Sequence, residues 1–353
     1  MGTPRPSGIT SGGTSRRAGI AAAVLAFVAG AIGGAVAQAT WSDYSAPPVA
    51  AMPEPPVVAP GVEPAGEEPS APNFVYRYLA PPSPALAEVA TQVRDRDLLR
   101  KLPEVQWLDG LLMLPETITY VAMECGEPDA YYLPDKREVV LCYEMMQVLY
   151  EQGAELATSG DVSSVVGPDA AADAAPSDIA QRYVWANLRF IASHETGHAL
   201  IELLDLPVTG RQEDAVDQFA TSVMQRIGGE HESPEQVAAN LRLAGHWFLA
   251  RADTGFSLDA YADTHSLGLQ RYFNLQCLLY GSDPERFAGI VARGDLPESR
   301  ARYCPAEAGR ASEAWMRLLR PHLAPRYAMT EAEAAEWMRQ RGEPAPTATP
   351  AQR

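Results

Sequence analysis

The sequence predicts an α+β protein, with a small β-sheet followed by a mainly helical body organised around one long helix. Two segments rich in branched and aromatic residues, 117–123 and 138–142, have the composition of strands. After Pro207 the chain consists of successive segments with helix start and stop signals. Between these two parts lies a mostly apolar segment, from about residue 178 to 204, that is long enough to form the central helix.

The first 39 residues have the organisation of an export signal. Arg16 and Arg17 precede an apolar run over residues 18–36, and the small residues of a cleavage site follow. The many alanines and glycines of the run favour a cleaved signal peptide, and the alternative is an uncleaved membrane anchor formed by residues 18–36. We therefore expect an exported protein, periplasmic or secreted, which would be tethered to the membrane if this segment is retained.

Composition separates one globular part from both ends of the chain. Residues 40–72 are rich in Pro, Ala and Glu and predict a stiff, disordered linker. The globular domain is expected over residues 73–342, with a disordered tail at residues 343–353. The formal charge of −17 argues against nucleic acid as a partner, because nothing would compensate the charge of the phosphates.

Within the globular domain, a helix is expected over residues 85–102, before the first strand. A turn at residues 134–136 separates the two strands, which would form a hairpin or a small sheet. Residues 152–177 are rich in Ala, Ser, Gly and Asp and indicate a flexible insertion, either a lid or a passive loop. After the central helix, capping signals and periodicity predict helices at residues 213–227, 233–252, 266–280, 282–293 and 330–342.

The central helix carries the sequence His-Glu-Thr-Gly-His at residues 194–198. Residues four apart share one face of a helix, so His194 and His198 can both reach a single metal ion. Glu195, beside the first histidine, is the residue type that takes a proton from a metal-bound water. Polar groups in a mostly apolar helix are costly unless they have a role, which favours a metal site over a surface helix with two incidental histidines.

The next helical segment offers a third ligand. Glu213 and Asp217 are four residues apart, so Glu213 can bind the ion while Asp217 accepts a hydrogen bond from a ligand histidine. The three-histidine pattern is excluded, because Ile201 and Leu204 stand where its glycine and third histidine would be. We therefore predict two histidines and Glu213 as zinc ligands, with an open fourth position for water.

An H-E-x-x-H motif followed by E-x-x-x-D resembles the gluzincin metallopeptidases, the thermolysin-like class, which implies a zincin-like fold. More closely, residues from about 73 to 320 resemble a largely uncharacterised bacterial family of metallopeptidase-like proteins. Four blocks in the same order carry this resemblance, at residues 125–144, 194–201, 206–217 and 265–284. The resemblance implies that the predicted sheet lies beside the active-site helix and binds the substrate backbone by strand addition. A purely structural sheet is the alternative.

The predicted chemistry assigns further roles. Glu195 would accept the proton of the attacking water and pass it to the departing amine. The developing oxyanion needs a donor besides the metal, and His265, just before a helix and inside the fourth block, is the main candidate. Arg271 and Tyr272 follow it as further catalytic candidates. A capping or packing role is the alternative for each of these three residues.

The four cysteines are expected to form disulfides rather than to bind metal, since no C-x-x-C spacing occurs and an exported chain meets an oxidising compartment. Of the three possible connectivities, we choose Cys125 with Cys142 and Cys277 with Cys304, because pairs close in sequence fit the blocks of the resembled family.

The sequence thus favours an exported zinc metallopeptidase that acts on a peptide or protein substrate. The main alternative is a non-catalytic binding protein with a structural metal. Such a site needs no general base and usually closes its fourth position with another Cys or His. A metal-dependent hydrolase of other substrates would use the same ligands.

Overall fold

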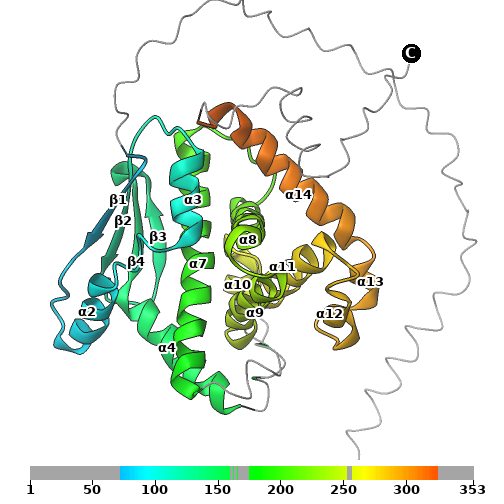
Figure 1. Ribbon diagram of the computed structural model, residues 1–353, viewed down its shortest axis with the longest axis horizontal. Helices are drawn as coiled ribbons and strands as arrows, with labels where there is room; N and C mark the ends of the chain where they lie inside the picture. Colours follow the sequence, from blue (N-terminus) through cyan, green and yellow to red (C-terminus); the bar gives the residue numbers. More distant parts are fainter. Residues whose placement is uncertain (1–71, 160–161, 163–164, 166–174, 253–256, 325–353) are drawn as a thin grey trace, which may run out of the picture. The chain divides into compact units, whose positions relative to one another are not determined.

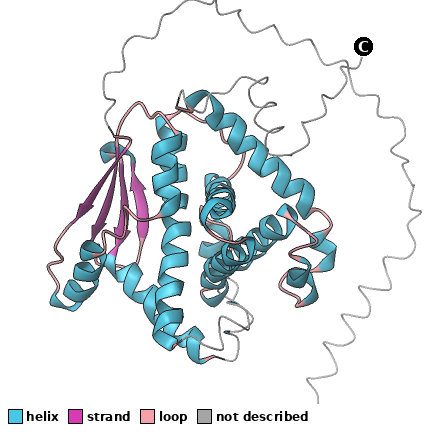
Figure 2. Ribbon diagram, viewed as in Figure 1, coloured by secondary structure: helices cyan, strands magenta, loops and turns pink. Residues whose placement is uncertain are grey.

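The computed structural model describes residues 72–159, 162, 165, 175–252 and 257–324. These residues form the α+β fold that the sequence predicts, a small sheet and a mostly helical body (Figure 2). The export signal, nearly all of the linker, the helix expected at residues 330–342 and the tail lie outside the described residues. Among the described helices, none is long and apolar enough to cross a membrane.

The sheet has four strands in the order β1-β2-β4-β3. Its strands are β1 (Phe74–Tyr78), β2 (Ile118–Met123), β3 (Ala130–Leu133) and β4 (Glu138–Cys142). The two strands expected from the sequence, β2 and β4, are therefore confirmed as part of a small sheet, but they pair in parallel and form no hairpin. The predicted turn instead joins β3 to β4, where Arg137 adopts a left-handed backbone with φ 53°. The four-residue strand β3 lies between β2 and β4 in sequence and makes their parallel pairing possible.

The segment before β2 contains two helices where one was expected. α2 (Ala87–Asp95) and α3 (Pro103–Leu111) are separated at Asp97, which has a left-handed backbone with φ 50°. The Asp97 carboxylate accepts a hydrogen bond from Tyr78 at 2.8 Å, which ties this break to the end of β1. After the sheet, α4 (Tyr143–Thr158) extends seven residues into the range expected to be an insertion, half of which lies outside the described residues.

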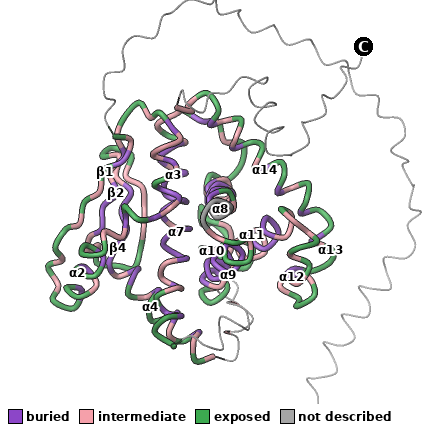
Figure 3. The backbone as a smooth tube through the Cα atoms, viewed as in Figure 1, coloured by how far each residue is buried: buried purple, intermediate pink, exposed green. Residues whose placement is uncertain are grey.

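The helix α7 (Pro176–Leu203) is the element on which the others pack. It lies between the sheet with α4 on one side and the later helices on the other, and buried residues follow its length (Figures 1 and 3). Its buried Thr196 shares a 2.6 Å hydrogen bond with the Tyr120 hydroxyl of β2. This contact fixes the H-E-x-x-H turn of α7 against the centre of the sheet.

The helical body after α7 is built mainly from three long helices and α14. Ser233 and Gln236 form the expected capping box at the start of α9. α8 continues to residue 231, so the predicted stop after Ile227 is wrong. The helices are α8 (Gln212–His231), α9 (Pro234–Ala250), α10 (Leu258–Ala262), α11 (Gly268–Ser282), α12 (Ala288–Ala292), α13 (Glu298–Ala301) and α14 (Cys304–Leu319).

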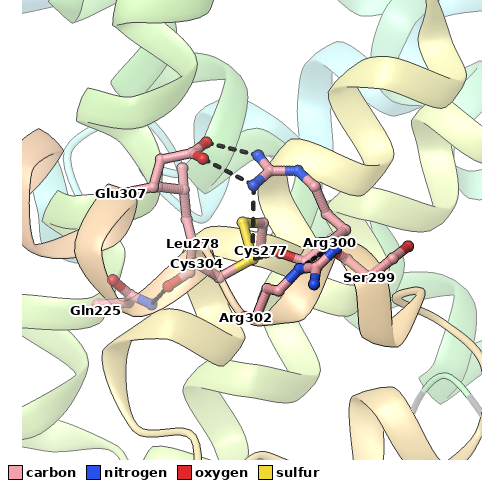
Figure 4. Close-up of a disulfide and its surroundings, with 8 residues drawn as sticks. All are labelled: Gln225, Cys277, Leu278, Ser299, Arg300, Arg302, Cys304 and Glu307. Atoms are coloured by element: carbon pink, nitrogen blue, oxygen red, sulfur yellow. Dashed lines mark hydrogen bonds and ion pairs between the residues drawn. A yellow bond between two sulfur atoms is a disulfide. The ribbon is translucent and has the colours of Figure 1, made fainter. Parts of the chain in front are cut away.

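Both predicted disulfides are confirmed. The bond between Cys125 and Cys142 joins the end of β4 to the segment that follows β2. The bond between Cys277 and Cys304 joins α11 to the start of α14 (Figure 4). The Arg300 guanidinium pairs with Glu307 at 2.7 Å beside this second disulfide. Two disulfides in a chain without free cysteines are typical of proteins that fold outside the reducing cytoplasm.

Candidate metal centre

The centre lies where α7 and α8 approach closely. The approach depends on Gly197, because an ideal Cβ built there would lie 2.8 Å from Cγ1 of Val216 and 3.1 Å from Cδ1 of Phe219. These distances are shorter than ordinary carbon contacts of about 3.5–4.0 Å, so only glycine fits without a shift. The close contact brings the first turn of α8 beside the two histidines of α7.

Three donor atoms converge at this contact. The Nε2 atoms of His194 and His198 are 3.3 Å apart, and Oε2 of Glu213 lies 3.1 Å from the first and 3.4 Å from the second. Donors held ~2.0–2.2 Å from one zinc ion at tetrahedral angles would be ~3.3–3.6 Å apart. The donor set that the sequence proposed therefore has the spacing and the chemistry to hold a zinc ion.

A second row of side chains orients the first histidine. Asp217 accepts a 2.8 Å hydrogen bond from Nδ1 of His194, as expected from the spacing in sequence. Arg271 donates to both carboxylate oxygens of Asp217, at 2.8 Å each, and its guanidinium lies 4.1 Å from the Phe248 ring centroid. Arg271 thus contacts the carboxylate behind His194 rather than the three donor atoms. Such partners fix the tautomer and the orientation of a ligand histidine.

Glu195 lies at the edge of the donor set, with its Oε1 atom 4.0 Å from Nε2 of His194. The residue is buried, and burial raises the pKa of its carboxyl above the usual value, while His194 and His198 act in the opposite direction. A carboxylate with a raised pKa is suited to accept a proton and release it again at neutral pH. Its position fits the general base that the sequence proposed.

The charges of the centre are strongly coupled in the metal-free protein. Burial alone would lower the pKa of His194, but its hydrogen bonds to Asp217 and Glu213 raise it to about 9. Burial alone would raise the pKa of Glu213, but hydrogen bonds from His194, His198 and His265 hold it far below the usual value. Protons and a metal ion compete for these donor atoms, because a histidine binds a metal only in its neutral form.

Of the two remaining catalytic candidates from the sequence, His265 lies at the metal centre and Tyr272 does not. His265 reaches the centre from the turn before α11, with its Nε2 3.0 Å from Oε2 of Glu213. Its ring is nearly parallel to that of His194, with the centroids 6.3 Å apart. Tyr272 instead packs between α11 and α9, beside Gly245 and Phe273, and none of its described contacts reaches the donor set.

Two features of this region were missed by reasoning from the sequence. Arg189, one turn before the motif, is buried and bound by the carboxylates of Glu104 at 2.6 Å and Glu232 at 2.8 Å. An arginine within the apolar run of the central helix is the signal that could have indicated a buried ion pair.

The second feature is a cavity of about 900 Å³ among α2, α4 and α7. Its lining includes none of the residues of the metal centre.

The motif and the family together indicate a class of protein. Two histidines four residues apart on a helix, with a glutamate beside the first, form a motif that many metallopeptidases share. Residues 78–319 match the family described as "Putative metallopeptidase", and the chain belongs to this family. No curated protein and no solved structure matches the chain.

Proposed function

We propose that the protein is an exported, zinc-dependent metallopeptidase that hydrolyses peptide bonds with Glu195 as the general base. The observation that carries this proposal is the convergence of three donor atoms within 3.4 Å of one another, with Glu195 beside them. The pattern of the first 39 residues and the two disulfides support export.

The residues divide the chemistry as follows. A zinc ion held by His194, His198 and Glu213 would act as a Lewis acid towards the peptide carbonyl and would make a water molecule acidic near neutral pH. Glu195 accepts the proton of the attacking water and returns it to the departing amine. His265, 45% exposed and next to Glu213, donates a hydrogen bond to the oxyanion that develops on the substrate.

The substrate backbone would bind along β3, one of the two edge strands of the sheet. The N–H of Cys142 donates to the carbonyl of Asp129 at 3.2 Å, which sets the antiparallel ladder between β4 and β3. In an antiparallel pair, successive residues of one strand direct their N–H and C=O groups alternately towards the partner strand and away from it. Asp129 points towards β4, so the N–H and C=O of Tyr132, three residues later, point away from β4. The Tyr132 hydroxyl donates to Glu202 of α7 at 2.7 Å, which holds this free edge beside the active-site helix. An extended peptide can therefore add to β3 next to the metal centre.

The test measures zinc content and peptide hydrolysis on the purified protein, for the wild type, Glu195→Gln and Glu213→Ala. We expect one zinc per chain, retained in Glu195→Gln and weakened in Glu213→Ala, with chelator-sensitive cleavage of casein or mixed peptides lost in both variants. Glu88→Gln, an exposed substitution on α2, is the control and should change neither property. A wild type that binds no zinc would refute the site. Tightly bound zinc without cleavage of any peptide would favour the non-catalytic binding protein instead.

A further inference from the structure

The turn that carries His265 lies between α10 and α11, outside both helices. Within it, the Asp263 carboxylate accepts hydrogen bonds from the backbone N–H of His265 at 2.7 Å and from its ring Nδ1 at 3.1 Å. These local bonds shape the turn, but they do not place it relative to the ligands on α7 and α8. The half-exposed ring contacts Glu213 of α8 at 3.0 Å, but the backbone of the turn needs a longer-range contact of its own if it is to keep a fixed position at the metal centre.

Arg211, the residue immediately before α8, supplies this contact. Its Nη1 donates to the backbone carbonyl of His265 at 2.9 Å and to that of Asp263 at 3.1 Å. The carbonyl of Thr264 lies 3.5 Å from the same nitrogen. The two hydrogens of Nη1 can serve the two shorter bonds, and the positive charge attracts all three carbonyl dipoles. One guanidinium group thus interacts with three consecutive backbone carbonyl groups of the turn.

The backbone of Arg211 is itself fixed to α8. Its carbonyl accepts the N–H of Ala215 at 3.2 Å, a bond of the first helical turn, and Glu213 follows two residues later. Any movement of the turn relative to Arg211 is therefore a movement relative to Glu213, which His265 contacts at 3.0 Å. We propose that Arg211 is a positioning residue, which holds His265 at the metal centre through the backbone of the 263–265 turn. Its effect on catalysis rests on the function proposed above.

An arginine suits this position better than a lysine does. A lysine would keep the charge, but its ammonium is a compact point charge on a flexible stem, whereas the guanidinium presents its donors in a rigid plane. Arg211→Lys should therefore retain part of the effect, and Arg211→Ala should lose it. Arg302 is the matched control, because it is also exposed and also donates to a backbone carbonyl, that of Ser299 at 3.1 Å, away from the centre.

The first test is amide hydrogen exchange of the 263–267 segment in the full chain, with exchange in α11 as an internal reference. Loss of two hydrogen bonds should speed exchange of this segment about tenfold or more in Arg211→Ala. Arg211→Lys should lie between this variant and the wild type, and Arg302→Ala should exchange like the wild type. Unchanged exchange of the segment in folded Arg211→Ala would overturn the proposal. This readout needs neither metal nor activity, so it stands if the proposed function fails.

The second test asks whether Arg211 acts through His265. If the chain is a peptidase, Arg211→Ala should lower kcat about tenfold with little change in KM, less than the ~100-fold or greater loss expected on removal of an oxyanion donor. In a His265→Ala background, Arg211→Ala should have no further effect on kcat, because the two residues act as one unit. An equal loss of kcat in both backgrounds would show that Arg211 acts elsewhere and would overturn the role assigned here.

Discussion

Replacement of Gly197 by alanine tests whether the close contact between α7 and α8 builds the metal centre. The added Cβ would lie 2.8 Å from Cγ1 and 2.9 Å from Cβ of Val216, a buried side chain with little room to move. Relief to an ordinary contact requires a displacement of about 0.7 Å or more. Ligand distances in metal sites are held within about 0.2 Å, so a shift of this size in α8 should misplace Glu213. We expect metal affinity to fall about 10–100-fold, as it does when the orientation of a ligand is lost.

The effect on folding should be smaller than the effect on metal binding. Overpacking of a buried contact costs about 1–3 kcal/mol, while replacing glycine by alanine inside a helix returns about 1 kcal/mol. The metal-free variant should therefore lose only about 0–2 kcal/mol in its free energy of unfolding. Zinc affinity would be measured by competition with a chromophoric chelator, and stability by urea unfolding of the metal-free protein.

The control for this prediction is Gly309→Ala in α14, where an added Cβ has nothing within 4 Å. It should stabilise the metal-free protein by about 0.5–1 kcal/mol and leave metal affinity unchanged. If Gly197→Ala behaved in the same way, the close approach of α8 would not depend on this glycine. The account of how Glu213 reaches the two histidines would then be wrong.

Three further predictions concern the support of the centre and of the fold. Arg271→Ala removes both donors from the carboxylate that orients the first ligand histidine, and zinc affinity measured by chelator competition should fall about 10–100-fold; an unchanged affinity would contradict the orienting role. Replacing both Cys277 and Cys304 by alanine should lower the free energy of unfolding by about 2–5 kcal/mol in denaturant titrations, and a loss below 1 kcal/mol would show that packing alone joins the two helices. Glu104→Gln leaves the fully buried Arg189 short of a charge partner and should cost about 3–5 kcal/mol. The double variant Glu104→Leu/Arg189→Met should recover most of this loss, and a double variant as unstable as Glu104→Gln would contradict the reasoning.

Patterns that act over a few residues could be predicted from the sequence. The four-residue spacing of His194 and His198 places both on one helical face wherever that helix lies. The same spacing links Glu213 to Asp217, and the capping box at Ser233 needs only its own turn of helix. The two disulfides join residues 17 and 27 apart, close enough in sequence for the pairing to be proposed before the fold was known.

Contacts between distant segments were decided by the tertiary structure. The parallel pairing of β2 with β4 depends on a strand of only four residues, which is too short to display a periodic pattern in the sequence. Arg271 and Tyr272 are neighbours in sequence, yet successive residues point about 100° apart around a helix. Only the packing of α11 against α8 and α9 determines which of the two faces Asp217.

The buried pairing of Arg189 with Glu104 spans 85 residues of sequence and likewise has no local signature. The hydrogen bonds from Arg211 to the turn before α11 also have no local signature in the sequence. Helix and cap formation depends on interactions within a turn or two, and the sequence displays these interactions directly. The arrangement of side chains from separate elements depends on which surfaces fit at van der Waals contact, as at Gly197, and only the folded chain determines that fit.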